Sequence, residues 1–293
     1  MDWRRRFTNK ADVTGTDFVQ QMFRAARNDL RPVMAYGRTS LARARHRNFL
    51  HQNRRLRPKF KNLLYRWEKE GIVGRMSKIQ AESLNAAVAG KDPEEVIRVV
   101  LQAVPGLAVV TTNFRPYEAV ILHLATRVRP ELPVLWIDHG ANLPETYRFA
   151  EAARARLDLD VRPYLPQMTA EHWKAIHGGT LPTPDQLERV EDFSRVMKLE
   201  PFERAMRENA PAVWITALRR EQNPQRAATL EPVMWDEKFG CLKVNPILDW
   251  TSQELNAYLA KHGLPDEQTY YDPAKGDEKH ECGLHAKLVT DRN

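Results

Sequence analysis

The stretch GLAVVTTNFRPYEAVILHLATRV, residues 106–128, contains the pattern that decides the fold. Its first part, 106–112, is a short apolar run rich in β-branched side chains, which is typical of a buried strand. Residues 116–128 then place apolar side chains at the spacing of a helix. The stretch therefore predicts a strand, a short polar loop and a helix in direct succession.

The same alternation continues along the chain. Apolar runs at residues 133–138, 212–218 and 239–247 predict further strands, and residues 143–157 predict a helix with Pro144 in its first turn. Strands separated by helices imply an α/β fold, with a mostly parallel sheet and helices on both faces.

Residues 251–263 carry signals for both ends of a helix. Thr251 stands three residues before Glu254, which is the spacing of a capping box. Gly263 is a typical residue just past the end of a helix. We therefore predict a helix between these two signals.

Ligands of parallel sheets bind beyond the carboxyl ends of the strands, so three loops form the candidate site. The first offers the hydroxyls of Thr111 and Thr112, which suit a phosphate or sulfate or an ordinary helix cap. The second places Asp138 before Gly140, in a position suited to a ribose or base contact. The third supplies three arginines that suit either a polyanionic ligand or surface salt bridges, namely Arg219, Arg220 and Arg226.

Charge is distributed unevenly along the chain. Residues 1–78 hold 20 Lys and Arg against 6 Asp and Glu, whereas the remaining residues hold 25 against 32. We interpret residues 1–90 as a basic helical region and residues 91–293 as the α/β domain, with a tail at 266–293. A solvated or docked amphipathic face explains the basic region, and nucleic-acid binding by residues 1–78 stays an alternative.

The composition limits the class of protein. A hydrophobic fraction of 42% over 293 residues is ordinary for a soluble globular protein, and no apolar run is long enough for a membrane span. The N-terminus lacks the apolar stretch of a secretory signal, and two cysteines make no disulfide framework, so we expect a cytoplasmic protein. The histidines show no paired ligand spacing, so no metal site is predicted.

One cysteine stands in a polar context, within KHECGLHAK at residues 279–287. A nucleophilic thiolate must be accessible and close to positive charge, which Lys279 and His280 can provide for Cys282. An incidental surface cysteine is the alternative. Cys241 lies within an apolar run, so we expect it to be buried.

Five motifs together resemble the sulfonucleotide reductases, in the same order and at comparable spacing through residue 265. They are LPETYRF, MKLEP, LRREQ with a following arginine, NPILDWT and ECGLH. The resemblance covers about residues 100–285. It implies an adenine-nucleotide α-hydrolase-like fold, related to the PP-loop ATP pyrophosphatases. It also implies reduction of phosphoadenylyl sulfate or adenylyl sulfate to sulfite, in sulfate assimilation and cysteine biosynthesis.

The resemblance further implies roles for particular residues. Cys282 corresponds to the catalytic cysteine, which forms an S-sulfonate that thioredoxin or glutaredoxin then resolves. The sulfate- and phosphate-loop positions correspond to Thr111, Thr112 and Asn113. The basic positions that contact the ligand correspond to Lys198, Arg219, Arg220, Arg226 and His285, the last of these beside the catalytic cysteine.

The number of cysteines separates the two branches of that family. The adenylyl-sulfate branch carries an iron–sulfur cluster on four cysteines, and this chain has two. We therefore expect the cluster-free branch, with 3′-phosphoadenylyl sulfate as substrate, thioredoxin as reductant and no bound cofactor. Adenylyl-sulfate reductase activity stays an alternative.

The chain departs from the family pattern at three places. Arg115 and Pro116 stand where the family has glycine after the phenylalanine, and DHGA at 138–141 replaces DTGY. Only the fifteen residues 266–280 separate Pro265 from Glu281, whereas family members have a longer stretch that helps to close the site.

These departures leave two other classes open. One is a catalytically impaired paralogue that binds nucleotides or associates with nucleic acid. The other is an adenylyltransferase of the same fold, whose loop should read Ser-Gly-Gly-x-Asp-Ser, unlike TTNFRPYEA at 111–119. Oligomeric state is also open, with a homodimer as one alternative.

Overall fold

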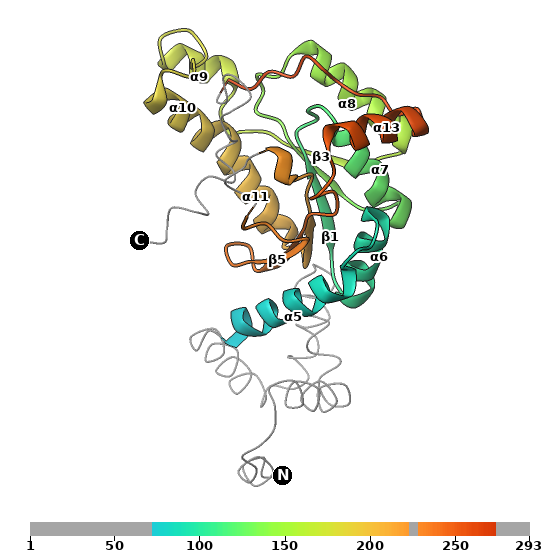
Figure 1. Ribbon diagram of the computed structural model, residues 1–293. Coiled ribbons are helices and arrows are strands. Elements are labelled where there is room, and N and C mark those ends of the chain that lie inside the picture. Colours follow the sequence, from blue (N-terminus) through green and yellow to red (C-terminus); the bar gives the residue numbers. More distant parts are fainter. Residues whose placement is uncertain (1–71, 223–227, 274–293) are drawn as a thin grey trace, which may run out of the picture. The chain divides into compact units, whose positions relative to one another are not determined.

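A computed structural model describes residues 72–222 and 228–273 of the protein (Figure 1). All of these residues belong to one compact unit. Three of the predicted site residues, Arg226, Cys282 and His285, lie outside the described residues, as does most of the basic region 1–90.

A six-stranded sheet forms the centre of the described part, in the order β3-β2-β1-β4-β6-β5. Every neighbouring pair is parallel except β5 and β6, so the predicted mostly parallel sheet is confirmed. In chain order, the strands are β1 (Ala108–Thr112), β2 (Val134–Ile137), β3 (Val161–Tyr164), β4 (Val213–Ile215), β5 (Val233–Asp236) and β6 (Cys241–Val244).

Two strands, β3 and β5, are not indicated by the sequence pattern. Both lie at an edge of the sheet. Within β3, Arg162 and Pro163 are exposed, so the strand lacks the apolar run that identifies a buried one. Proline is tolerated there because an edge strand has one side without ladder hydrogen bonds.

Helices cover both faces of the sheet, and β1 shows why. Successive side chains of a strand point to opposite faces: Val110 packs in the larger core cluster, whereas Val109 packs with Phe202 and Met206. The larger cluster includes residues of α5 (Ile72–Val88), α6 (Pro93–Ala103), α7 (Glu118–Val128), α8 (Pro144–Leu157) and α13 (Ser252–His262). The opposite face is covered by α11 (Glu200–Asn209).

Helix α5 is joined to the edge strand β5. The side-chain amide of Asn85 donates to the Val233 carbonyl (2.9 Å) and accepts from the Val233 N–H (2.8 Å). One amide therefore satisfies both backbone groups of an edge residue. The division of the chain at residue 90 stays a prediction, and α5, which precedes it, packs on the α/β sheet.

A π-helical turn, η2 (Arg195–Leu199), separates α10 (Leu187–Ser194) from α11. The Glu200 N–H bonds to the Arg195 carbonyl, five residues back, instead of four. Pro201 follows directly and has no N–H to continue the regular ladder. Such widened turns occur often at functional sites, and this one carries the predicted ligand residue Lys198.

A smaller helical layer precedes this turn. Trp173 of α9 (Ala170–Ile176) packs with Phe193 and Met197 in a separate core cluster. Within residues 72–222 and 228–273, no helix has both the length and the apolar character that crossing a membrane would demand.

The three predicted helix signals are observed. Pro144 lies in the first turn of α8, and Thr251 and Glu254 form a complete capping box at the start of α13. Gly263 adopts the left-handed conformation after that helix, with φ of 56°. This positive φ favours glycine because an L side chain there is strained.

The capping box generates a stability prediction. We expect Thr251→Ala to lower the free energy of unfolding by about 1 kcal/mol, because the N–H of Glu254 loses its acceptor. Urea denaturation measures this difference. Gln253→Ala, on the exposed side of the same turn, should change stability by less than about 0.5 kcal/mol. Equal losses in the two variants would contradict the assigned cap.

Candidate active site

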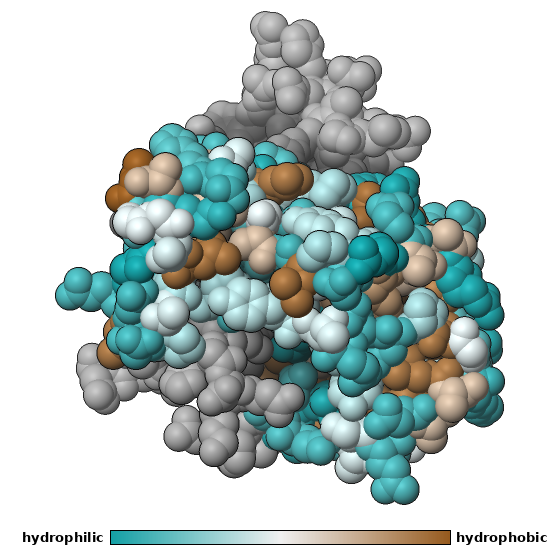
Figure 2. Space-filling model, turned by 90° about the horizontal axis from the view of Figure 1, so that it is seen from above, coloured by the Kyte–Doolittle hydropathy of each residue, from teal (hydrophilic) through white to brown (hydrophobic). Residues whose placement is uncertain are grey.

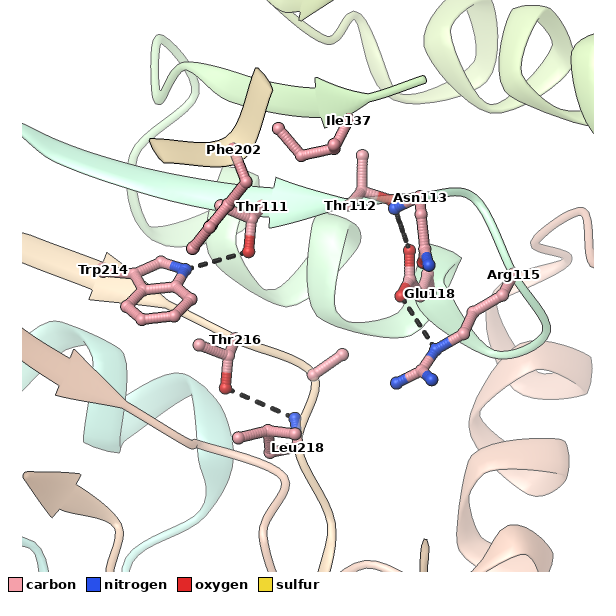
Figure 3. Close-up of a pocket in the computed structure, with 11 residues that line it drawn as sticks. Thr111, Thr112, Asn113, Arg115, Glu118, Ile137, Phe202, Trp214, Thr216 and Leu218 are labelled. Carbon is pink, nitrogen blue, oxygen red and sulfur yellow. Dashed lines mark hydrogen bonds and ion pairs between the residues drawn. The ribbon is translucent and has the colours of Figure 1, made fainter. Parts of the chain in front are cut away.

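The sheet order places a switch point between β1 and β4. In the sheet, β2 and β3 lie on one side of β1. The strands β4, β6 and β5 lie on its other side. At such a point the loops after the two strands separate and leave a crevice. A cavity of ≈ 70 Å³ lies there (Figure 3). It is lined by Thr111, Thr112, Asn113, Arg115, Glu118, Ile137, Phe202, Trp214, Thr216, Ala217 and Leu218.

Glu118 organises the first loop from the start of α7. Its carboxylate is buried, with 5% exposure. Oε2 accepts from the Thr112 hydroxyl (2.5 Å) and from the Asn113 backbone N–H (2.9 Å), and Oε1 accepts from Arg115 Nε (3.1 Å). Burying a carboxylate without donors is costly, so these bonds fix the loop. The loop predicted to cradle a phosphate or sulfate thus gives these three donors to a carboxylate of the chain itself.

The backbone of this loop is held in an uncommon conformation. Phe114 and Tyr117 have φ of 51° and 70°, in the left-handed region that non-glycine residues rarely adopt. Contacts with distant parts of the chain stabilise it. The Tyr117 N–H donates to Asp266 Oδ1 (2.7 Å), and the Arg219 guanidinium lies over the Tyr117 ring, 5.5 Å from its centroid.

Thr111 is placed differently from Thr112. Its hydroxyl oxygen accepts from the indole N–H of Trp214 (2.9 Å), across from β1 to β4. A hydroxyl that accepts one hydrogen bond still has its own hydrogen to donate. Thr111 is therefore the loop hydroxyl whose geometry suits a ligand oxygen in the cavity (Figure 3).

The second loop is organised by Asp138, directly after β2. Its Oδ1 accepts from the Gly140 N–H (2.9 Å), the Asn142 side-chain amide (2.8 Å) and the Tyr147 hydroxyl (3.1 Å). The structure thus gives Asp138 a role in shaping the turn, and the contact with a ribose or base stays a prediction. Burial raises the pKa of the Tyr147 hydroxyl to about 12, so this group remains a hydrogen-bond donor.

His139, next in the loop, is buried at 2% exposure. Its Nδ1 accepts from the Ala141 N–H (3.2 Å), which assigns the proton of a neutral ring to Nε2. Nε2 is buried and has no hydrogen-bond partner among the residues that the structure describes. Burial, with the positive charge of Lys198 as a second cause, lowers the pKa of His139 to about 4.

The two described arginines of the third loop, Arg219 and Arg220, are paired within the chain. Arg219 is buried and donates to Glu221 (2.8 Å), and it also reaches the Ser252 hydroxyl (3.3 Å). Burial lowers the pKa of Arg219. Arg220 donates to Asp249 (2.7 Å) and to the Leu230 carbonyl (2.6 Å). These partners fit the salt-bridge interpretation, and a role of either arginine in ligand binding stays a prediction.

Lys198 points into a buried polar cluster instead of the cavity lining. Its ammonium donates to Asp272 in a short ion pair. Asp272 lies on the segment that follows α13, residues 264–273, which we call the strap. The strap also contacts the first loop, where the Tyr270 hydroxyl donates to the side-chain oxygen of Asn113 (3.1 Å) and the Asn113 amide donates to Glu118 (2.8 Å).

The structure therefore brings part of the predicted site together. Thr111, Thr112 and Asn113 share one cavity, and Lys198 joins it through the strap. Sequence reasoning missed four residues that shape the site, namely Glu118, Asp266, Tyr270 and Asp272. The only signal for Glu118 is an acidic residue in the first turn of a predicted helix, and the three strap residues carry no motif. Within the described part of the chain, no group of three or more His, Cys, Asp or Glu could hold a metal ion.

The prediction that Cys241 is buried is confirmed. Cys241 is fully buried on β6 and packs in the cluster beneath α11. Such a thiol acts as a small apolar residue.

Comparisons with known proteins agree with this architecture. The family model described as phosphoadenosine phosphosulfate reductase domain matches residues 108–272. A phosphoadenosine 5′-phosphosulfate reductase from Xanthomonas axonopodis pv. citri is 33% identical over 229 residues, which cover 71% of this chain and 93% of that protein. A protein of the same name from Xylella fastidiosa is 31% identical over 229 residues, covering 71% of this chain and 94% of that protein.

A solved structure supports the fold. The phosphoadenylyl-sulfate reductase from Candida auris, in a phosphate complex, matches with a TM-score of 0.55 at 23% identity, and covers 64% of this chain and 87% of that one. The mostly parallel sheet and this structural match show an α/β fold of the adenine-nucleotide α-hydrolase-like class. Within that class, the chain belongs to the phosphoadenosine phosphosulfate reductase family.

The buried ring of His139 generates a prediction about acid stability. Because its folded pKa of about 4 lies below the ordinary value of 6.5, the unfolded chain binds the proton more readily between these values. The neutral ring therefore contributes fully to the free energy of unfolding above pH 6.5. This contribution, roughly 3 kcal/mol in total, is lost as the pH falls toward 4.

We expect His139→Gln, which cannot titrate, to lose stability less steeply than the wild type over this range. Urea unfolding at pH 7.5, 6, 5 and 4.5 provides the free energies of both proteins. Parallel curves for the two proteins would contradict the assigned burial of a neutral ring.

Proposed function

We propose that the protein reduces 3′-phosphoadenylyl sulfate to sulfite and adenosine 3′,5′-bisphosphate, with a thiol as electron donor, in sulfate assimilation. The observation that carries this proposal is the family membership, because the similarity spans 93% of a relative named for this activity. The cavity at the switch point of the sheet supports it, since ligands of such folds bind there.

The reaction needs a nucleophilic thiolate, and Cys282 is our candidate. The thiolate attacks the sulfur of the sulfonucleotide, the S–O bond breaks, and adenosine 3′,5′-bisphosphate leaves with the bonding electrons. This leaves an S-sulfonate on Cys282. A dithiol protein of the thioredoxin or glutaredoxin class then attacks the Cys282 sulfur, releases sulfite and becomes oxidised to a disulfide after a second thiol exchange.

The proposed substrate contacts come from the loops described above and from segments outside the described residues. We propose that His285 supports the thiolate of Cys282, and that the nucleotide is bound by Thr111, Thr112, Asn113, Asp138, Gly140, Lys198, Arg219, Arg220 and Arg226. Lys198, Arg219 and Arg220 need a change of partner to do so, because each forms an ion pair with a carboxylate of the chain.

The reductant is proposed from the reaction, and its docking surface is not assigned. Figure 2 shows hydrophobic residues on one face in several separate groups among hydrophilic ones. The large apolar side chains that are exposed, among the described residues, are Ile79, Leu165, Ile176, Leu187 and Tyr271. Scattered exposed apolar residues are normal on protein surfaces. A cytoplasmic location, the oligomeric state and the role of residues 1–78 stay predictions.

The nucleotide preference can be tested with the purified protein. Two cysteines cannot supply the four thiolates of an iron–sulfur cluster, so we expect a colourless protein that turns over the 3′-phosphorylated nucleotide faster than adenylyl sulfate. Sulfite release from each nucleotide, with thioredoxin present, measures the preference. A brown protein with stoichiometric iron, or faster turnover of adenylyl sulfate, would overturn this assignment.

The nucleophile is tested by replacing each cysteine in turn. Cys282→Ser should abolish sulfite formation while nucleotide binding remains, because a serine hydroxyl is far less ionised at neutral pH than a thiol. Cys241→Ser is the matched control. It should keep its activity with a modest loss of stability, since it places a hydroxyl in an apolar cluster.

Mass spectrometry locates the intermediate directly. Wild-type protein incubated with the sulfonucleotide and no thioredoxin should gain about 80 Da, one sulfonate, on the peptide that contains Cys282. An active preparation without the adduct, or with the adduct on Cys241, would defeat the mechanism. Nucleotide binding without any sulfite release would instead indicate a catalytically impaired member of the family.

A further inference from the structure

The strap connects the elements of the candidate site. It leaves the end of α13 and, in Figure 1, runs in red across the molecule toward the α9–α10 side. Asp266 accepts from the Tyr117 backbone N–H, and Tyr270 contacts Asn113, so its first part lies against the first loop. Asp272 then pairs with Lys198 of the π-helical turn. Three polar contacts thus hold the strap across the carboxyl end of the sheet.

The last of these contacts differs from the others in its burial. The side chains of Lys198 and Asp272 are 5% and 2% exposed. Removing two charges from water is expensive, and their mutual attraction repays this cost only when the geometry is good. If either partner is lost, the other is left as a buried charge without compensation. The buried ammonium of Lys198 therefore needs a negatively charged partner both with and without a bound substrate.

A second hydrogen-bond donor, the Nε2–H of His139, lies near Lys198 and is not bonded to the strap. His139 lies close enough for the charges of Lys198 and Asp272 to influence it. Its Nε2–H is buried, and within residues 72–222 and 228–273 no acceptor bonds to it. A buried donor left unpaired costs stability, and such groups in native proteins call for an explanation. An oxyanion with several acceptor oxygens would satisfy an ammonium and an imidazole N–H better than one carboxylate does.

We propose that the Asp272 carboxylate competes with the anionic group of the substrate for Lys198. When the substrate binds, its anionic group replaces Asp272 at Lys198 and accepts a hydrogen bond from the Nε2–H of His139. The ligand class is an oxyanion, either sulfonate or phosphate. This inference rests on the proposed function and adds to it a residue that limits substrate affinity. Aspartate suits the role because its charge matches a substrate oxygen while its tether keeps it permanently available.

The test removes the charge of the competitor without changing its shape. Asp272→Asn should bind adenosine 3′,5′-bisphosphate at least tenfold more tightly than the wild type in titration calorimetry, because the ligand no longer displaces a carboxylate. Lys198→Met should bind weakly, and Asp272→Asn should give no gain in the Lys198→Met background. Asp160→Asn is the matched control, since it neutralises a carboxylate of the exposed pair with Arg162; its affinity should equal that of the wild type.

Inorganic sulfate is the second probe, because it needs no adenosine pocket. Asp272→Asn should have a lower urea midpoint than the wild type, and sulfate should restore the midpoint more strongly in the variant, since an anion that binds the folded state stabilises it. His139→Gln, added to Asp272→Asn, should remove part of the gain in affinity for both probes. No gain for either probe in Asp272→Asn would overturn the proposal.

A measurement on the wild type keeps the proposal testable even if Asp272→Asn does not fold. Binding of adenosine 3′,5′-bisphosphate should increase amide hydrogen exchange in peptides that cover residues 264–273, because the strap loses its contact with Lys198. Inorganic sulfate should have the same effect, and binding of both probes with this exchange unchanged or slowed would refute the exchange of anions. Absence of sulfite release from the wild type would count against the proposed function alone, since these binding experiments do not involve turnover.

Discussion

The hydrogen bonds of the Glu118 carboxylate are the interaction on which the rest of the site depends. A carboxylate at 5% exposure needs donors, and the loop between β1 and α7 bends back to provide them from Thr112, Asn113 and Arg115. The bend places Phe114 and Tyr117 in the left-handed region, a cost that the surrounding contacts offset. Because the same loop closes the switch point between β1 and β4, the shape of the cavity follows from how one buried charge is satisfied.

The strap extends this arrangement to the other side of the site. Asp266 and Tyr270 contact the first loop, and Asp272 contacts the π-helical turn. The sheet therefore positions the ends of the strands. The strap, which contains no helix or strand, sets how the loops lie relative to one another. A chain with few residues between Pro265 and Glu281 has little length for a separate lid, and the strap uses that length for direct polar contacts.

The sequence predicts the fold better than the site, and the reason is the range of the interactions. The run of apolar residues at 106–112, the capping box at Thr251 and the burial of Cys241 are visible locally, and each is confirmed. The pair of Lys198 with Asp272 joins residues 74 positions apart, and no local pattern marks it. Glu118 is equally hidden, since acidic residues in the first turn of a helix are common and usually face solvent. The candidate residues could be named from motifs, but their partners could not.

Because these cations already have partners in the chain, a ligand that binds them competes with existing ion pairs. A site for a polyanion needs several cations, and in the absence of substrate each buried cation must be compensated. The buried cations Lys198 and Arg219 pair with Asp272 and Glu221, and the partly exposed Arg115 pairs with Glu118. A substrate that takes any of these cations must replace a carboxylate, so its binding energy is the difference between two sets of ion pairs, and the full Coulomb attraction is never gained. A site built in this way favours ligands with more oxygens and more charge than one aspartate or glutamate supplies. Under the proposed exchange at Lys198, the carboxylates of the chain set a threshold for binding, which an anion with more oxygens and more charge than one carboxylate exceeds.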